Sequence, residues 1–474
     1  MKAYRWFGRC ASLGAFMVPG LALCLPSGYS YGAALLLLAA LASAPVWWRR
    51  PAPRAAWWLT AAFSCMAALW LLDVGATWGW GSMDRPVKYL LALPCIFYLM
   101  TFEPRASWLW MGVAVGAVGS GLVGLYQTFV MALPRANGFT NAIQYGNLSM
   151  LLAVMSGLLL VVQWRRWVLW QRLLLAAAIV LGAAGSVLSQ SRGGWLALVL
   201  LLPASAWLLV RTTGQRRVYW GLCALALAAA ALSQVPAVEQ RVDEARQEVQ
   251  TYKDHGDGRS SVGQRLAHWH LAWQMGWDRP LTGWGRAGYV EEKARRVAAG
   301  QAHPVVLEFG HAHNEVLDLF AKRGIPGVLL LLAFYGIPLV MFWPTAPRIR
   351  DGAGKMDRES LSLCLMGVLL PLSYIGFGLT QVFLAHNSGN MFYLFMCPLL
   401  LAALHERRAR IGCGRPFYMR HPPERLRRFP PLSHCCAMRA GGRSPRCGAA
   451  LARLPGTAPC RFQPLRASQR AIDN

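Results

Sequence analysis

Long stretches without charge are the feature that most constrains this chain. The blocks at residues 31–48, 173–188 and 193–210 contain almost no charged side chain. Apolar runs of roughly 18 to 25 residues match the thickness of the hydrocarbon core of a bilayer. Because that core offers no water to the backbone, each run must form a helix. The sequence therefore predicts an all-α, polytopic membrane protein.

The length of these runs predicts about twelve transmembrane helices. The first follows Lys2, Arg5 and Arg9, as a signal peptide would. No clear A-x-A cleavage site follows it, and another apolar run comes at once, so we expect a retained helix. The predicted spans are residues 8–26, 31–48, 56–75, 86–103, 107–131, 144–163, 167–189, 193–211, 217–233, 323–343, 360–381 and 390–405.

The distribution of charge predicts the orientation. The net charge is +27, yet only 15% of residues are charged, against about 25% in soluble domains. The cations fall in short connections and in the tail, which argues against a nucleic-acid-binding domain. Every second connection is basic, as expected of cytoplasmic loops. Both termini are therefore predicted to be cytoplasmic, and residues 233–322 to lie outside. The basic set comprises Arg49, Arg50, Arg54, Arg105, Arg165, Arg166, Arg211, Arg216, Arg217, Arg348, Arg350, Lys355 and Arg358.

Four segments follow from this pattern. Residues 1–233 hold the first nine predicted helices, and residues 234–322 form a long helical outer loop. Residues 323–405 hold the last three helices. Residues 406–474 are rich in Arg, Pro and Cys, and we expect a disordered cytoplasmic tail. Its cysteines lack C-x-x-C spacing, so a zinc site is not predicted.

The outer loop reads as helices separated by turns. Residues 235–252 have a helical pattern, and glycines at 256 and 258 break it. A second helix is predicted to start at Ser261, with Ser261 and Gln264 as a capping box. Residues 279–288 are rich in turn formers and could be a simple connector. The segment from Gly310 to Glu315 is predicted to open a helix that runs toward the next span.

Several cations stand in outer connections, which normally avoid them. They are Arg85, Lys88, Arg135, Arg192 and Arg265. Such residues can simply extend their charge to interfacial water, but a cation near the membrane plane usually faces a cavity or a partner. Arginine grips phosphate oxygens with a planar fork. An anion held at the membrane surface, such as a lipid-linked pyrophosphate, fits this set. A D-x-D metal motif is absent from the sequence, which favours a metal-free site.

His313 is the candidate general base, because imidazole suits proton transfer near neutral pH. A capping or packing role is the alternative. His311 and His313, with His303 and Glu315, could instead bind a metal, although adjacent ligands on one short stretch rarely close a tetrahedral site. The polar run His386-Asn387-Ser388 in the last outer connection is a weaker candidate.

Taken in order, these elements resemble the O-antigen ligase/polymerase superfamily, and within it most closely the O-antigen ligases of Gram-negative bacteria. The resemblance covers residues 1–405. It rests on Lys88, Gly138-Phe139-Thr140-Asn141, Ser191-Arg192-Gly193-Gly194, Arg265, Pro280-Leu281-x-Gly283-x-Gly285 and His311-Ala312-His313-Asn314.

The resemblance implies an inner-membrane glycosyltransferase that moves O-antigen polysaccharide from undecaprenyl pyrophosphate to the lipid A–core, surrounded by membrane lipids. By the family pattern, Arg192 and Arg265 engage the donor pyrophosphate and His313 activates the acceptor hydroxyl. Lys88 helps to hold phosphate, and Arg85, Arg135, His311 and Asn314 are the further substrate-binding candidates. No metal, cofactor or nucleotide sugar is expected, and a single displacement implies inversion at the anomeric carbon.

Three alternatives remain open at this point. O-antigen polymerases and protein O-oligosaccharyltransferases share the donor and differ in the acceptor. A twelve-helix transporter is the third, but the sequence shows no convincing internal repeat or pair of broken helices in matching halves.

Overall fold

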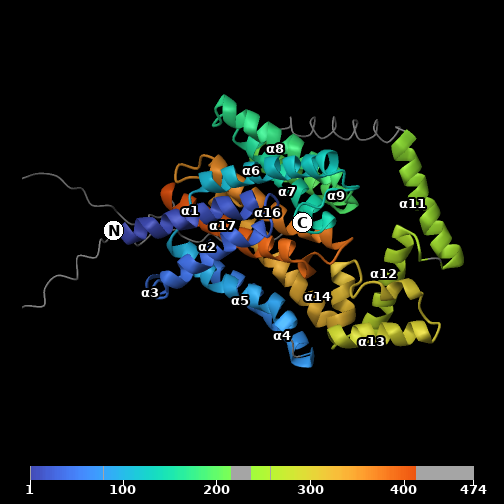
Figure 1. Cartoon of the computed structure of the whole chain (residues 1–474). Coiled ribbons are helices and arrows are strands. Elements are labelled where there is room, and N and C mark those ends of the chain that lie inside the picture. The colour runs from blue at the N-terminus through green and yellow to red at the C-terminus, as the bar shows by residue number, and fades with distance from the viewer. Residues whose placement is uncertain (1, 78–79, 215–235, 257, 413–474) are drawn as a thin grey trace, which may run out of the picture. The chain divides into compact units, whose positions relative to one another are not determined.

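The computed structural model describes residues 2–77, 80–214, 236–256 and 258–412. Within them the elements are helical, and a β-bridge pairs Arg350 with Met356 (Figure 1). The α-helices are α1 (Lys2–Leu21), α2 (Gly28–Ala42), α3 (Ala44–Trp47), α4 (Arg54–Thr77), α5 (Trp80–Thr101), α6 (Ala106–Leu125), α7 (Ala142–Val162), α8 (Leu169–Leu188), α9 (Arg192–Thr213), α11 (Pro236–His255), α12 (Ser261–Asp278), α13 (Gly285–Ala298), α14 (Glu315–Phe342), α15 (Ala346–Ile349), α16 (Arg358–Gly378) and α17 (Asn387–Arg410). Shorter turns are a π-helical turn η1 (Tyr126–Val130) and the 3-10 turns η2 (Pro304–Leu307) and η3 (Phe383–Ala385).

Eight of the described helices are long and apolar enough to cross a membrane. They are α4, α6 with η1, α7, α8, α9, α14, α16 and α17. This confirms the polytopic, helical class. The number twelve stays a prediction. The predicted spans at 8–26, 31–48 and 86–103 coincide with α1, α2 and α5, which are not among the eight. The predicted span at 217–233 lies outside the described residues.

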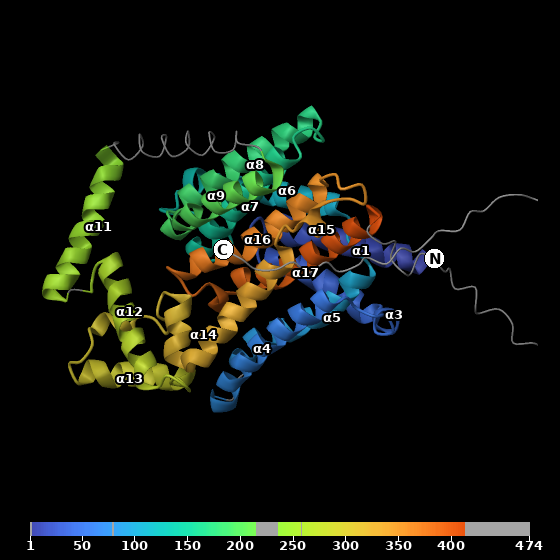
Figure 2. The same cartoon turned by 180° about the vertical axis from the view of Figure 1, so that it is seen from behind.

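The core lies around α7, α16 and α17. About 89% of the apolar window is buried in both α16 and α17, against 28% in α8. Figures 1 and 2 show α8 and α9 beside α7, and α16 packs against α9, α14 and α17. Large apolar side chains such as Val180, Val199 and Val340 remain exposed. Exposed apolar side chains of this kind suit contact with lipid tails.

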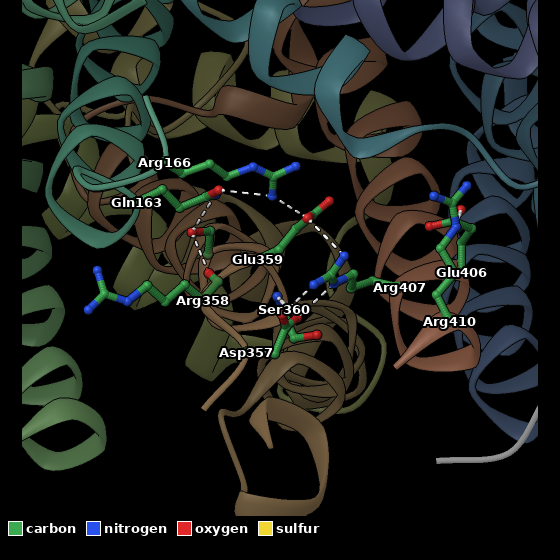
Figure 3. A network of polar contacts seen from close by, with 10 residues as sticks. Gln163, Arg166, Asp357, Arg358, Glu359, Ser360, Glu406, Arg407 and Arg410 are labelled. Carbon is green, nitrogen blue, oxygen red and sulfur yellow. Dashed lines mark hydrogen bonds and ion pairs between the residues drawn. The ribbon is translucent and has the colours of Figure 1, made fainter. Parts of the chain in front are cut away.

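Polar contacts sort the connections into two groups at opposite ends of the helices. The basic connections meet one another through Arg50 with Tyr4, Tyr4 with Thr101, Arg166 and Arg407 with Glu359, Arg407 with Asp357, and His405 with Glu103. Figure 3 shows part of this network. The other group meets through Asp73 with Arg323, Lys88 with Asn387, and Thr140 with Ser388. The predicted alternation is therefore reflected in the fold, while the side that faces the cytoplasm stays a prediction.

The loop helices confirm the helical reading of the segment and correct one detail. The capping box at Ser261 and Gln264 was wrong, because Ser260 caps α12 by accepting the N–H of Gly263 at 3.0 Å. Ser260 has extended backbone, as a capping residue needs, and Ser261 is already helical. Gln264 instead donates to Glu308 at 2.6 Å.

The turn-rich segment predicted at 279–288 is a connector only as far as Trp284, because α13 begins at Gly285. This connector has a packing role. It lies against a kink in α14 at Gly324, whose φ of 65° and ψ of −161° interrupt the helix. The carbonyl of Pro280 accepts the N–H of Ile325 at 2.7 Å. Gly283 has a φ of 63°, and a Cβ there would lie 2.3 Å from the backbone nitrogen of Arg323. Glycine at both positions therefore lets the two backbones approach at the kink in α14.

Replacing Gly324 by alanine should break this contact. The added Cβ would lie 2.3 Å from the carbonyl oxygen of Pro280, and the backbone region is essentially restricted to glycine, at a cost of about 1–3 kcal/mol. We expect Gly324→Ala to lower the melting temperature of the purified protein in detergent. Gly336→Ala in the same helix is the matched control, because nothing lies within 4 Å of its Cβ. Equal melting temperatures for the two variants would contradict this role of the kink.

Candidate active site

His313 lies in the turn that leads into α14. Its φ of 52° is left-handed, which a non-glycine residue adopts only when its surroundings hold it there. Asn314 supplies part of that hold. Its Oδ1 accepts the N–H groups of Val316 at 3.0 Å and Leu317 at 3.1 Å, and its Nδ2 donates to the carbonyl of Leu379 at 3.2 Å. The structure thus places Asn314 as the helix cap, and a contact with substrate stays a prediction.

Gln381 connects two histidines. Its Oε1 accepts from Nδ1 of His313 at 2.9 Å, and its Nε2 donates to Nε2 of His386 at 3.0 Å. In this orientation of the amide, Nδ1 of His313 carries the proton and Nε2 carries a lone pair. Nε2 is buried and has no hydrogen-bond partner within the described residues. The lone pair makes a general-base role chemically possible, and that role stays a prediction.

Sequence reasoning missed Gln381. The residue is the last position of the predicted span at 360–381, and it is only 2% exposed. An uncharged polar side chain at the end of a membrane span does not by itself indicate a functional site, because such ends commonly meet water. Its proximity to His386, in the polar run already noted, was the available signal.

Three histidine rings gather next to Phe309. The His313 ring centre lies 4.4 Å from that of His311 and 5.4 Å from that of His268. Both nitrogens of His268 are buried without a partner in the described part of the chain. Burial lowers the pKa of His268 from 6.5 to about 3 and that of His311 to about 4. Burial is also the largest cause that lowers the pKa of His313, and the charge of Arg265 lowers it further. All three rings are therefore neutral at pH 7.

The alternative of a metal centre finds no grouping of ligands here. Among the described residues, no three His, Cys, Asp or Glu side chains are placed to share a metal ion. His303 caps η2, since its Nδ1 accepts the N–H of Val305 at 3.1 Å. The carboxylate of Glu315 accepts the N–H of Leu384 at 3.0 Å. Both side chains thus accept hydrogen bonds from backbone N–H groups.

Arg85 and Lys88 reach the same site from α5. The Arg85 guanidinium lies 4.4 Å from the ring centre of Trp70 and donates to the carbonyl of Ala385 at 3.4 Å. Lys88 pairs with Asp84 and donates to Oδ1 of Asn387 at 2.6 Å. Burial lowers the pKa of His386, and the charge of Arg85 contributes. The structure therefore brings these two predicted cations beside the 385–387 segment.

Arg192 begins α9, and its side chain lies outside the described residues. The backbone around it is close to Gln381. A Cβ on Gly193 would lie 2.9 Å from Oγ1 of Thr380, so glycine permits the start of α9 to press against this segment. Ser191 donates to Oδ1 of Asn147 at 3.2 Å. The Ser-Arg-Gly-Gly motif thus begins a helix at the site.

Arg135 is exposed on the loop at 131–141. Two contacts fasten that loop to the connection before α9. Gln190 donates to the carbonyl of Pro134 at 2.8 Å, and the N–H of Ala136 donates to Leu188 at 2.9 Å. Arg135 therefore lies on a loop that is held against the connection before Arg192. Its contact with substrate stays a prediction.

Lys293 is a buried cation that sequence reasoning also missed. It is 1% exposed and donates to the carbonyls of Val306, at 2.6 Å, and Phe309. Burial lowers its pKa from 10.5 to about 8, with Lys322 as the next cause. Lys322 donates to the carbonyl of Gly310 at 3.0 Å. The two lysines hold the irregular segment that carries His311 and His313.

The buried histidines predict acid sensitivity. A histidine that stays neutral when folded, but has an ordinary pKa of 6.5 when unfolded, contributes stability above pH 6.5 that is lost as the pH falls. Of these histidines, His268 has the pKa that is lowered most. Within the described residues, His268→Phe breaks no side-chain hydrogen bond. We expect the melting temperature of this variant to fall by about 2 °C less than that of the wild type between pH 7.5 and 5.5. His270→Phe, exposed on the same helix, should fall like the wild type. Parallel curves for His268→Phe and wild type would refute the assignment.

Two comparisons with known proteins bear on this site. A family model described as O-Antigen ligase matches residues 177–332, a stretch that contains Arg192, Arg265, His311, His313 and Asn314. The chain is also 26% identical over 313 residues to a protein of Haemophilus influenzae described as uncharacterized, which covers 66% of this chain and 77% of that protein. Over residues 177–332 the chain is therefore similar to the O-antigen ligase family.

Proposed function

We propose that this protein is an O-antigen ligase. It transfers O-antigen polysaccharide from undecaprenyl pyrophosphate to a sugar of the lipid A–core at the periplasmic face of the bacterial inner membrane. The family domain supports the class of lipid-linked donor. The observation that carries the proposal is the buried, unpartnered Nε2 of His313, whose ring is oriented by Gln381.

His313 acts as the general base. The acceptor hydroxyl gives its proton to Nε2 as its oxygen bonds to the anomeric carbon of the donor sugar. The bond from that carbon to the pyrophosphate oxygen breaks at the same time, and the pyrophosphate departs with the electron pair. The proton on His313 then passes to solvent. Because one displacement occurs, the anomeric configuration inverts. A lowered pKa keeps His313 unprotonated and ready at pH 7.

The cations stabilise the leaving group. Negative charge grows on the pyrophosphate in the transition state, and fixed positive charges are most effective there. Arg265 lies close enough to His313 to lower its pKa. Arg85 and Lys88 contact Ala385 and Asn387, and Arg192 starts α9 next to Thr380. We assign these four residues, with Arg135 at the approach, to the two phosphates.

A reconstituted reaction tests the function. Purified protein in lipid would receive undecaprenyl-pyrophosphate-linked glycan and lipid A–core in the presence of a metal chelator. A ladder of products attached to lipid A–core supports the ligase. Lengthening of the lipid-linked glycan with donor alone would identify a polymerase instead. Glycan on an added acceptor protein would identify an oligosaccharyltransferase, and the absence of any product would remove the proposal.

Loss of the base or of a cation should abolish transfer without unfolding the protein. His313→Asn suits the left-handed backbone and should lower the rate about 10²- to 10⁴-fold. Arg265→Ala should lower it about 10²- to 10³-fold. The controls are His270→Ala and Arg246→Ala, exposed residues of α12 and α11, which should keep wild-type rates. Initial rates from the gel assay and melting temperatures decide the matter. Full activity in either site variant would remove that residue from the mechanism.

Variants of Gln381 should shift the pH profile in opposite directions. Its hydrogen bond raises the pKa of His313 against the lowering effect of burial. Gln381→Leu should therefore move the acidic limb of kcat/KM to lower pH, because the imidazolium loses that support. Gln381→Glu adds a negative charge beside the ring and should move the limb to higher pH. Shifts of the same sign in both variants would show that Gln381 acts on packing alone.

A further inference from the structure

A cavity lies at the end of the helices away from His313. Its volume is about 210 Å³. It is formed where α7 and α9 end and where α16 begins. Its walls are mostly apolar, and two cations stand at its edge. The lining residues are Val161, Val162, Leu209, Thr213, Lys355, Met356, Arg358 and Leu361.

The cavity lies at the depth of lipid headgroups. The three helices that form it are all long and apolar enough to span a membrane, and it adjoins their final or first turns. The helix α16 runs 21 residues from Arg358 at the cavity to Gly378 near Gln381, which corresponds to roughly 30 Å. This length matches the hydrocarbon core of a bilayer. At this depth apolar walls suit acyl chains, and cations suit the phosphate layer.

Among the residues that the structure describes, Arg358 forms no ion pair, whereas the arginines beside it do. Arg407 pairs with Asp357 and Glu359, and Arg166 pairs with Glu359. Figure 3 shows Arg358 extending away from these acids. Its guanidinium donates to the carbonyl of Val162 at 3.4 Å.

Lys355 adds a second charge. Its side chain is exposed, and within the described residues its ammonium forms no ion pair. The carboxylate of Asp351 in the same turn accepts the N–H groups of Ala353 at 3.0 Å and of Lys355 at 2.8 Å. An anion that has an apolar part would therefore complement the two cations and the apolar cavity next to them.

We propose that this cavity binds an anionic phospholipid of the surrounding membrane. The phosphate lies between Arg358 and Lys355, where the guanidinium donates to two oxygens and the ammonium contributes a point charge. The first part of an acyl chain lies along Val161, Leu209 and Leu361. Basic pockets between membrane helices are typical sites for acidic headgroups. This inference does not depend on the proposed reaction.

Lipid binding to the full-length protein tests the proposal. Protein in detergent would be titrated with phosphatidylglycerol or phosphatidylcholine, and bound lipid counted by native mass spectrometry. We expect the wild type to prefer phosphatidylglycerol at least tenfold. The double variant Lys355→Ala/Arg358→Ala should lose that preference. The matched control Arg49→Ala/Arg54→Ala removes two exposed cations of the same group of connections, away from the cavity, and should keep it.

Two further arms separate the cavity from general charge and from free phosphate. Val161→Trp keeps both cations and narrows the cavity, so it should also weaken phosphatidylglycerol binding, and a normal melting temperature will show that it is folded. Inorganic phosphate should not displace the lipid. Equal binding of the two lipids by the wild type, unchanged preference in the double variant, or displacement by inorganic phosphate would overturn the proposal.

Discussion

The hydrogen bond between His313 and Gln381 joins residues 68 positions apart in the chain, and the arrangement of the site depends on it. One partner lies in the turn that opens α14, and the other in the connection between α16 and α17. These connections cannot satisfy their polar groups through helix hydrogen bonds. They do so through one another: Asn314 donates to Leu379, and Glu315 accepts from Leu384. These hydrogen bonds between the two connections satisfy irregular backbone at a membrane surface. They also fix the orientation of the His313 imidazole.

Burial then gives that imidazole its chemical character. A histidine in water is partly protonated near neutral pH, whereas His268, His311 and His313 are kept neutral by desolvation and by neighbouring cations. A cationic site is therefore compatible with a base, because the positive charges that would hold a pyrophosphate also disfavour protonation of the ring. Arg265 lowers the pKa of His313, and in the proposed reaction it also holds the pyrophosphate. The charge of Lys293 also lowers the pKa of His313. Its hydrogen bonds to two backbone carbonyls hold the 306–312 segment in place.

Close backbone contacts require glycine at particular points. Gly193 lets α9 begin against Thr380, and Gly283 lets the 279–284 connector lie on the kink at Gly324. These contacts explain the glycines of two sequence motifs through packing. The segments with cations in the predicted outer connections are thereby brought to one end of the helices. The paired acids and arginines of Figure 3 lie at the other end.

The sequence by itself determined the class of the protein, because runs of uncharged apolar residues have no stable alternative to helices in a bilayer. It also singled out His313, Lys88 and Arg85, since these depend on local pattern or on charge out of place, and it named Asn314 as a substrate-binding candidate rather than as the cap of α14. Only the tertiary structure decided which residues meet. Sequence reasoning did not single out Gln381, His268 and Lys293, because their roles arise from burial and from partners distant in the chain. The cap of α12 shifted from Ser261 to Ser260 for a related reason: two adjacent serines are equivalent in the sequence, and backbone geometry chose between them.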